Sequence, residues 1–347
     1  MSDHSAIQWT DATWNPTTGC TKVSPGCAQC YIERTPPFRI AKRRFVNGHI
    51  PLRLHEDRVQ QPLSWSTPRR IFVNSLSDLF HDDVPDAFIL QVLDVIRRCP
   101  QHTFQVLTKR AGRMRALMSV LRFDHAGSGR MFLAEASSLN RQGQPISFAP
   151  LMKNLWLGVS VENQHFADER IPLLLQTPAA VRFISAEPLL EKVLLDNGES
   201  SWLTCTPHNQ SRNGADCCLT FLEDGDRHFR GIDWVIVGGE SGAGSRPFDL
   251  AWARSLVQQC QAAGVPAFVK QLGAKPINSS HGITYCANEP HATKCNAVIL
   301  RDRKGGDIDE WPPDLRVREF PTRHVHTAGS TGNSPPPGGL AESHGGD

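Results

Sequence analysis

The sequence predicts an α/β protein whose core is a full or partial (β/α) barrel, and three observations support this prediction. Six short apolar runs, rich in β-branched residues, each end in polar residues. The runs are continuous rather than alternating, which is typical of strands buried on both faces of a parallel sheet. Helical patterns separate several runs, and such alternation builds parallel βαβ units. About seven units, counting one ahead of Cys20, favour a barrel over an open doubly wound sheet.

The elements follow in a regular order. The predicted strands span residues 70–79, 103–110, 155–164, 182–189, 233–242 and 267–274. After the first of them, Pro85 fits the first helical position behind Asp83, and apolar residues then recur at helical spacing as far as Cys99. Asp249 and Gly264 have the residue types that cap the start and the end of a helix. Residues 163–176 are a further helical candidate, which Pro172 interrupts.

The chain of 347 residues is long enough to form one elaborated domain. We expect residues 1–275 to form the barrel, with insertions at 119–150 and 196–230. Residues 276–325 are predicted to be a C-terminal extension packed on the barrel. The last part, 326–347, is rich in glycine and proline and is expected to be disordered.

Composition excludes several classes of protein. The 37 Lys and Arg nearly balance the 35 Asp and Glu, and no apolar run approaches the ~20 residues of a membrane span. The start of the chain has no basic and apolar signal, so we expect a cytoplasmic protein. Ten cysteines in that compartment point to reduced thiols rather than disulfides. Two of them, Cys99 and Cys260, lie on apolar helix faces and are expected in the core.

The strongest chemical signal is a cysteine loop at residues 19–31. Cys20, Cys27 and Cys30 form a C-x6-C-x2-C array, and the Pro25-Gly26 turn lets the loop fold back on itself. Three thiolates in one loop favour a bound cation, which would hold them deprotonated. An iron–sulfur cluster with one open iron needs only these three ligands. Structural zinc needs a fourth ligand, and three unligated thiols are the remaining alternative.

Other cysteines offer further ligands for the zinc alternative. A fourth ligand could come from a histidine such as His208 or from Cys205, Cys217 or Cys218. Cys286 and Cys295 are a further candidate pair. We expect these five cysteines to lie in insertions or in the extension and to bind nothing.

Polar side chains follow the predicted strands, at the edge where a (β/α) barrel carries its functional site. Any one of them has an alternative interpretation as a helix cap or turn residue, above all Asn163. Six strands ending in such groups would place uncompensated charge around one opening, which favours a polar ligand there. The residues are Asn74, Ser75, Asp78, Lys109, Ser160, Glu162, Asn163, Ser185, Glu187, Glu240, Ser241, Lys270 and Gln271.

The cysteine loop resembles the cluster loop of radical S-adenosylmethionine (SAM) enzymes, although six residues rather than three separate its first two cysteines. The run 74–78 and the Leu107-Thr108-Lys109 strand end resemble the branch that contains spore photoproduct lyase and DNA-repair-photolyase-like proteins. Residues 5–321 more closely resemble an uncharacterised phage-protein family with a three-cysteine motif. The matching pieces are 13–20, 158–163, 185–188, 238–242 and 310–321.

The radical-SAM resemblance implies a [4Fe–4S] cluster on Cys20, Cys27 and Cys30, with SAM bound to its open iron. Asp78 or Glu162 would then meet the SAM amine or sulfonium. Ser160 and Asn163 would bind the ribose, and Tyr31 would either pack beside the adenine or be a core aromatic. The whole predicted SAM-binding set is Tyr31, Asn74, Ser75, Asp78, Ser160, Glu162, Asn163, Gly238, Gly239 and Glu240.

The same resemblance implies reductive cleavage of SAM to a 5′-deoxyadenosyl radical, with an electron donor as partner. Lys109 and Lys270 would hold an anionic substrate, and Glu187 would bind a polar group of it. Gly238, Gly239 and Glu240 match a Gly-Gly-Glu stretch of radical SAM enzymes, but on a late strand, so that role is not transferred. The two glycines still permit close approach of a ligand to the backbone.

A basic segment follows the cysteine loop directly. Residues 34–70 carry nine Lys and Arg against two acids, with Phe38, Phe45 and Trp65 among them. Such a segment suits phosphate neutralisation and base stacking, although a solvated basic face is an equally good interpretation. We therefore predict a nucleic acid or nucleotide substrate for modification or repair. The alternative function is a non-catalytic iron–sulfur or zinc protein that recognises nucleic acid or a phage partner.

Overall fold

The structure is a computed structural model that describes residues 5–123, 131–133, 152–196, 201–204, 219–221, 227–229, 231–279 and 297–321. Its centre is a seven-stranded sheet in which every neighbouring pair is parallel and the strand order follows the chain. In this order the strands are β1 (Ala12–Trp14), β4 (Arg70–Val73), β5 (Thr103–Thr108), β8 (Leu155–Ser160), β9 (Val181–Ala186), β12 (Trp234–Gly238) and β14 (Ala267–Gln271).

The sheet curls into an open half-barrel. Within the described residues, β1 pairs only with β4 and β14 pairs only with β12 among the strands of this sheet, so its two ends do not join. The sheet has seven strands, as the predicted number of units implied, and of the two predicted forms the partial barrel is the one observed. Its strands are buried along their whole length in β8 and β12, as the continuous apolar runs predicted.

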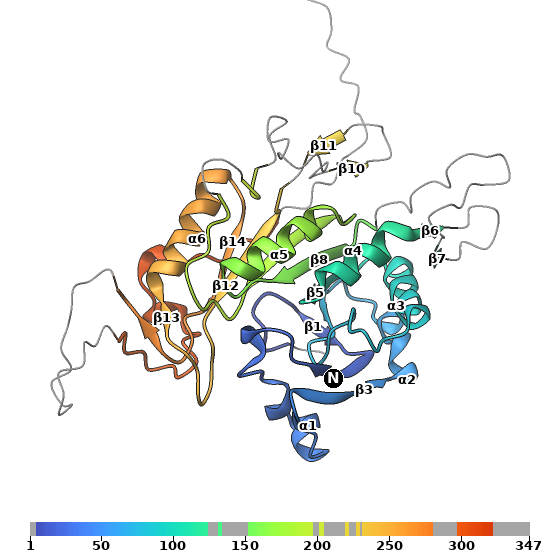
Figure 1. The fold of residues 1–347 in the computed structure, drawn as a ribbon, viewed down its shortest axis with the longest axis horizontal. Helices are drawn as coiled ribbons and strands as arrows, with labels where there is room; N and C mark the ends of the chain where they lie inside the picture. Colours follow the sequence, from blue (N-terminus) through green and yellow to red (C-terminus); the bar gives the residue numbers. More distant parts are fainter. Residues whose placement is uncertain are drawn as a thin grey trace, which may run out of the picture.

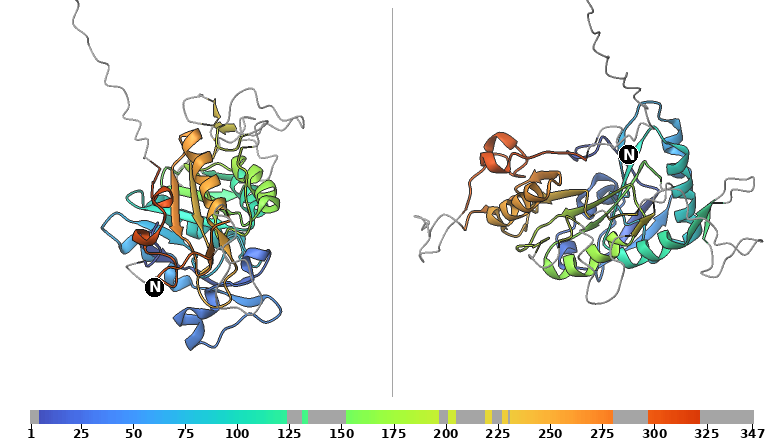
Figure 2. Two further views of the ribbon diagram at one scale, coloured as in Figure 1. Left: turned by 90° about the vertical axis from the view of Figure 1, so that its left-hand side faces the viewer. Right: turned by 90° about the horizontal axis from the view of Figure 1, so that it is seen from above.

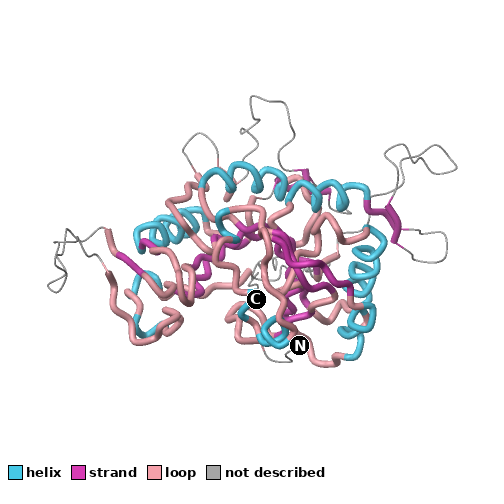
Figure 3. Tube along the Cα trace, turned by 60° about the horizontal axis from the view of Figure 1, so that its bottom comes forward, coloured by secondary structure: helices cyan, strands magenta, loops and turns pink. Residues whose placement is uncertain are grey.

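Four helices cover the outer face of the sheet (Figures 1 and 3). They are α3 (Asp86–Arg98), α4 (Ala111–Val120), α5 (Gln164–Leu175) and α6 (Leu250–Ala263). The predicted caps of α6 are confirmed, because Asp249 accepts a hydrogen bond from the backbone of Ala251 and Gly264 has a left-handed φ of 66°. Pro85 is the N-cap of α3 rather than its first residue, since its ψ of 140° is extended. None of the described helices has the length and apolar character needed to cross a bilayer.

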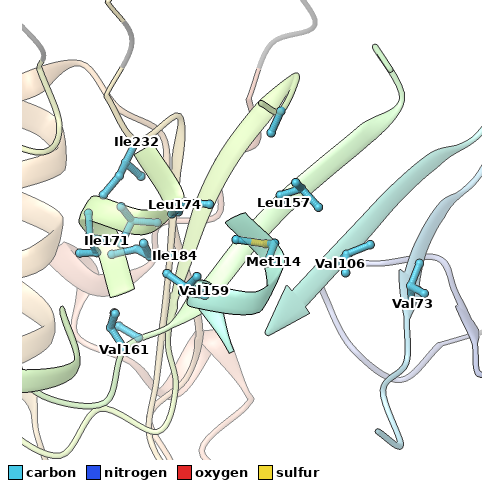
Figure 4. Packing of buried hydrophobic residues seen from close by; sticks show 14 of the residues in the cluster. Val73, Val106, Met114, Leu157, Val159, Val161, Ile171, Leu174, Ile184 and Ile232 are labelled. Carbon is cyan, nitrogen blue, oxygen red and sulfur yellow. The ribbon is translucent and has the colours of Figure 1, made fainter. Parts of the chain in front are cut away.

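The main core lies between the sheet and these helices. Val106, Leu157 and Ile184 point from three neighbouring strands toward Met114 and Leu174 on the helices (Figure 4). Each of these five side chains is fully buried. Removing an aliphatic side chain of this size from water contributes roughly 1.5–3 kcal/mol, so this layer is the chief source of stability. Cys99 and Cys260 are also fully buried here, as predicted.

The inner face of the half-barrel carries an aromatic cluster. Residues alternate along a strand, so Trp156 and Gly158 face inward while Leu157 faces the helices. The cluster consists of Trp9, Phe72, Trp156, Phe183, Trp234, Ile236 and Phe268. A side chain on Gly158 would place its Cβ 2.6 Å from the Phe183 ring, so the close packing of this cluster requires glycine there.

The described C-terminal residues 297–321 lie along β14. The backbone of Val269 donates to Val317, and that of Glu319 donates to Ala267, which pairs this segment with the free edge of β14. Phe320 then packs on Trp234, and the Arg70 guanidinium lies 4.2 Å above the Phe320 ring. The segment therefore covers the edge of β14 and reaches β4, near the other end of the open sheet (Figure 2, red).

Shorter elements complete the chain. β2 (Thr17–Thr21) and β3 (His49–Leu54) form an antiparallel pair, and α1 (Pro36–Ile40) lies between them in the sequence. The other short elements are α2 (Glu56–Val59), β6 (Leu121–Phe123), β7 (Met131–Leu133), β10 (Leu219–Phe221), β11 (Arg227–Phe229), β13 (Phe248–Asp249), β15 (Pro276–Ile277) and five 3-10 turns (Pro25–Cys27, Ile32–Arg34, Gln61–Ser64, Ile308–Glu310 and Pro313–Leu315). Most of the predicted insertions and the whole predicted tail, residues 326–347, lie outside the described residues.

Candidate functional site

The cysteine loop lies across the carboxyl edge of the half-barrel. At its start, Gly19 donates its backbone N–H to Leu76 and accepts a hydrogen bond from the Ser77 hydroxyl, both in the loop after β4. In its middle, the Gly26 N–H donates to Glu162, just after β8, with an N···O distance of 3.4 Å. The loop is therefore tied to the ends of two strands.

The residues just beyond the loop reach a third strand end. The Arg34 guanidinium donates to the Ala243 carbonyl, in the turn after β12. Gly242 and Gly244 in that turn have φ values of 99° and 79°, and side chains there would meet Arg34 and Gln29. The glycine-rich turn 238–244 thus serves as a docking surface for the protein's own cysteine segment.

The three thiols are free and half-buried. Burial raises the pKa of Cys20 to about 12, and the charge of Asp78 adds to this effect. Burial also raises the pKa of Cys30. The three sulfurs are electrostatic neighbours, because charge on Cys27 or Cys30 raises the pKa of Cys20 further. At neutral pH the free Cys20 and Cys30 are therefore thiols, and binding of a metal would have to displace their protons.

Cationic groups surround these sulfurs. Arg110, at the start of α4, is almost fully buried, and its charge lowers the pKa of Cys20, though less than burial raises it. Lys109 and Lys22 both lower the pKa of Cys30, though less than burial raises it. Arg110 was not predicted from the sequence. Its only local signal is that it follows the Leu107-Thr108-Lys109 strand end.

Asp78 links the loop after β4 to the end of β5. Its carboxylate accepts hydrogen bonds from the Thr108 hydroxyl at 2.7 and 2.9 Å, and from the backbones of Phe80 and Lys109. It also forms an ion pair with Arg110 at 3.0 Å. The carboxylate predicted to meet SAM is thus already bound within the protein and fixes Arg110 beside Cys20.

Glu162 has a comparable internal role. Its side chain is fully buried and pairs with Arg170 of α5 at 3.0 Å, while its other oxygen accepts from Gly26 of the cysteine loop. Arg170 also donates to the Ser160 carbonyl. Sequence reasoning found Glu162 but missed Arg170, because one cation within a helix gives no sign of a buried partner. Ser160 itself lies buried at the end of β8.

Asn163 is a helix cap in this structure. Its side-chain oxygen accepts a hydrogen bond from the Phe166 backbone at 3.1 Å, which begins α5. This is the alternative that the sequence left open for Asn163. The carboxamide oxygen is consequently engaged within the protein.

Tyr31, Ser75 and Asn74 meet beneath the loop. The Tyr31 hydroxyl donates to the Ser75 carbonyl while its ring is 51% exposed, so it is not a core aromatic. The Ser75 hydroxyl donates to Asn15 at 3.2 Å. Asn74 has a positive φ of 58° and accepts from the Thr17 backbone, whereas its buried amide nitrogen has no hydrogen-bond partner within the part of the chain that the structure describes. That orphaned donor is a group that a ligand would satisfy.

Glu187 and Lys270 form a second polar group on the inner face. Their charged atoms lie 3.0 Å apart, and the Ser185 hydroxyl donates to the other Glu187 oxygen. Tyr31 belongs to this group electrostatically: although much of the residue is exposed, burial of its hydroxyl and then the charges of Cys30 and Glu187 raise its pKa. A side chain on Gly238 would meet Glu187 at 2.6 Å, so glycine there makes room for the carboxylate.

Glu240 pairs with a different residue, Arg246. It forms a two-pronged ion pair with Arg246, which also donates its backbone N–H to the same carboxylate. Burial raises the pKa of Glu240, but the hydrogen bonds from Arg246 outweigh that effect and the net pKa is lowered. Gly239 packs closely, since a Cβ there would lie 2.7 Å from the Leu272 carbonyl.

The basic segment divides into structural and free cations. Arg43 donates to the Thr18 hydroxyl, and Arg70 pairs with Asp11 at 2.9 Å. Residues 34–55 contain six Lys and Arg and no acid. Four of the six are exposed and form no ion pair with any residue that the structure describes, namely Arg39, Lys42, Arg44 and Arg53. These four lie on α1, β3 and their connection, at the lower edge in Figure 1. We call them the basic arm.

The types of side chain at the cysteine loop are those that hold a thiolate-bound metal or cluster. Three free thiols from one loop and the neighbouring cations are the groups that such a centre uses. Within the described part of the chain, no three His, Cys, Asp or Glu side chains converge closely enough to hold a metal ion. Binding would therefore require the three sulfurs to turn toward a common centre. The candidate ligands Cys205, Cys217, Cys218, Cys286 and Cys295 lie outside the described residues.

Comparison with known proteins yields a single family. No match was found among curated proteins, and none among solved structures. The expected likeness to radical SAM enzymes has no counterpart in these comparisons and stays a prediction. Residues 4–310 match the family described as "Protein of unknown function (DUF5131)". Because this match covers most of the chain, the protein belongs to the DUF5131 family.

Proposed function

We propose that the protein is a radical SAM-type iron–sulfur enzyme that acts on a nucleic acid or nucleotide in the cytoplasm. The observation that carries this proposal is the placement of the three free thiols. One loop presents them over the carboxyl edge of a partial parallel barrel, where two strand ends hold that loop and a third holds Arg34 just beyond it. This is the edge at which (β/α) barrels carry their chemistry.

The residue types support a three-cysteine cluster in particular. Cys20, Cys27 and Cys30 would hold the cluster, which leaves one iron for a second ligand. Arg110, Lys109 and Lys22 bring positive charge to sulfurs that become anionic on ligation. When bound, a reduced [4Fe–4S] cluster of this kind supplies the electron that cleaves SAM to methionine and a 5′-deoxyadenosyl radical.

The chain's own residues would bind and orient the substrate. Glu187 and Lys270 present opposite charges on the inner face, next to Tyr31 and Cys30. A polar substrate group can replace either partner of that ion pair. The aromatic cluster fills the inner face below and keeps water out of that side of the site. The amide of Asn74, which none of the described residues accepts from, offers one more donor at this edge.

A second candidate function has its own supporting observation. Three of the carboxylates predicted to contact SAM already pair with arginines of the protein, namely Asp78, Glu162 and Glu240. This arrangement favours a non-catalytic protein whose iron–sulfur or zinc centre orders the loop. In that case the cysteine loop would serve recognition of nucleic acid or of a phage partner.

The two candidates separate in one experiment. The chain is reconstituted anaerobically with iron and sulfide, reduced, and given SAM, and 5′-deoxyadenosine is measured. The proposed enzyme releases it, and Cys27→Ser abolishes the release. Cys99→Ser is the matched control, because that thiol is buried in the core far from the loop in sequence. A cluster without release of 5′-deoxyadenosine would favour the non-catalytic protein.

The basic arm is the observation that supports a nucleic acid or nucleotide as the substrate. Its four exposed cations lie next in sequence to the cysteine loop and have no acidic partners among the described residues. Cations of this kind neutralise backbone phosphates and release counterions, so binding weakens as salt rises. An electron donor completes the set of partners that the proposed reaction needs.

Binding of single-stranded and duplex DNA and RNA across a salt series tests the substrate class. We expect replacement of Arg39, Lys42 and Arg44 by Gln to weaken binding and to reduce the salt slope by up to about 0.9 per lost phosphate contact. The control variant removes the same charge elsewhere, with Lys153, Lys192 and Lys304 replaced by Gln, all exposed. Equal behaviour of the two variants would refute the role of the arm.

A further inference from the structure

Arg110 and Cys20 converge on one carbonyl oxygen. The Cys20 sulfur donates to the Thr21 carbonyl at 3.6 Å, and Arg110 Nη2 donates to the same oxygen at 3.2 Å. Two donors that share an acceptor lie side by side. The guanidinium is thus held at the same carbonyl oxygen as the Cys20 thiol.

The guanidinium is built into this position. Its Nη1 binds Asp78 at 3.0 Å, and the side chain is only 8% exposed. Its Nε is buried and has no hydrogen-bond partner among the described residues, although it forms a longer ion pair with the Asp82 carboxylate at 3.6 Å. A buried guanidinium N–H without an acceptor is costly, so it marks a place where an acceptor is expected. Besides the carboxylates of Asp78 and Asp82, a Cys20 thiolate is an anion that would interact with this guanidinium.

From this geometry we infer that Arg110 is a positioning residue that donates to the Cys20 thiolate once the loop holds its cluster. The inference rests on the proposed function and extends it to the control of the cluster. Asp78 holds the guanidinium on one side, and Thr108 holds Asp78 in turn. A hydrogen bond and a positive charge at a ligating sulfur favour the reduced cluster, which carries one more electron.

The other charged groups around Cys20 do not replace Arg110. The Asp78 charge opposes a thiolate, and Cys27 and Cys30 would be ligands themselves. His81 donates to the Thr21 hydroxyl, and burial together with the Arg110 charge lowers its pKa. Because the ordinary pKa of His81 is 6.5, this imidazole is neutral at pH 7 and above. Arg110 is therefore the permanent cation at this sulfur.

The reduction potential of the anaerobically reconstituted full-length chain tests the inference. A redox titration followed by the cluster's visible absorption and electron paramagnetic resonance gives the potential without any turnover. We expect Arg110→Gln to lower the reduction potential of the cluster. At a fixed applied potential, the ratio of reduced to oxidised cluster should fall on the order of tenfold, which corresponds to about 59 mV for one electron. Arg110→Lys keeps the charge and should fall between Arg110→Gln and wild type.

Arg113→Gln is the matched control. Arg113 lies one turn further along α4 and binds the carbonyls of His81 and Val84 and the carboxylate of Asp86, away from the sulfurs. A cluster that forms in all variants with one common potential would overturn the inference while leaving the proposed function intact. Failure of wild type to form a cluster would instead overturn the proposed function. The inference would also be supported if Arg110→Gln failed to form the cluster while Arg110→Lys and Arg113→Gln still formed it.

Discussion

Glu162 and Arg170 show how single residues hold the cysteine loop in place. Both side chains are essentially inaccessible to water, with exposed fractions of 0% and 1%. A buried pair adds little net stability, but loss of one partner leaves an uncompensated charge inside the protein. The second oxygen of Glu162 accepts from Gly26, so this pair connects the rigid outer helix to the loop.

Glu162→Gln should therefore destabilise the fold by about 3–5 kcal/mol, because Arg170 is left buried without a counter-charge. Urea unfolding followed by circular dichroism measures this change. Asp314→Asn is the control, since Asp314 is 52% exposed and its pair with Arg254 is screened by water. Equal losses in the two variants would show that the burial of Glu162 is not what matters.

Gly158 offers a second test at the scale of one residue. Gly158→Ala should destabilise the fold by about 1–3 kcal/mol, since its Cβ would lie 2.6 Å from the Phe183 ring inside the aromatic cluster. Gly112→Ala is the matched control. Gly112 lies in α4 with no atom within 4 Å of its would-be Cβ, so alanine should stabilise that helix by roughly 0.5–1 kcal/mol. Thermal melting of both variants shows whether Gly158→Ala lowers the melting temperature and Gly112→Ala raises it.

At the scale of elements, the C-terminal segment replaces the missing closure of the barrel. It adds main-chain pairing to β14 and brings Phe320 against Trp234 and Arg70. Phe320→Ala should cost about 2 kcal/mol, less than a fully buried phenylalanine because the ring is only partly covered. Ile299→Ala in the same segment should change nothing, since Ile299 is 94% exposed. If urea midpoints of the two variants agree, the segment does not stabilise the sheet.

The strands and helices were largely predictable because their signals are local. Continuous apolar runs identified six strands, and the Asp249 and Gly264 caps fixed the ends of α6. The strand ends were placed too far along the chain. The predicted strand at 155–164 stops at Ser160, because its polar end turns to cap the next helix at Asn163. Whether the barrel closes depends on contacts between distant ends, which no local pattern records.

The sequence predicted which types of residue lie at the candidate site but not how they pair with one another. The three cysteines and most polar strand ends were found, but their internal partners were not. Arg110 and Arg170 pair with Asp78 and Glu162 over separations of 32 and 8 residues. Such pairing depends on how the strands and helices pack in the fold. The sequence alone therefore identifies the carboxylates but not the arginines that neutralise them.

For the whole molecule, three buried or half-buried histidines make stability depend on pH. Burial is the largest cause of the lowered pKa values of His55, His81 and His102, whose ordinary value is 6.5. The unfolded chain therefore binds protons that the folded chain excludes. Their contribution to stability is complete above pH 6.5 and is lost as pH falls through the lower folded-state pKa values.

We expect the free energy of unfolding to fall between about pH 7 and pH 5, as measured by urea titration at each pH. His81→Gln should flatten this dependence, because His81 is nearly fully buried. His165→Gln is the control, since that imidazole is exposed. An identical slope in wild type and His81→Gln would contradict the assignment of this effect to His81.

The central claim concerns the three thiols of the loop, and metal analysis after anaerobic reconstitution tests it most directly. Iron and acid-labile sulfide are counted in wild type, in the variant with Cys20, Cys27 and Cys30 replaced by Ser, and in Cys260→Ser, whose thiol is buried in the core. The account predicts a [4Fe–4S] complement in wild type and in Cys260→Ser, and none in the triple variant. Stoichiometric zinc on the three cysteines without iron, or iron and sulfide retained in the triple variant, would contradict it.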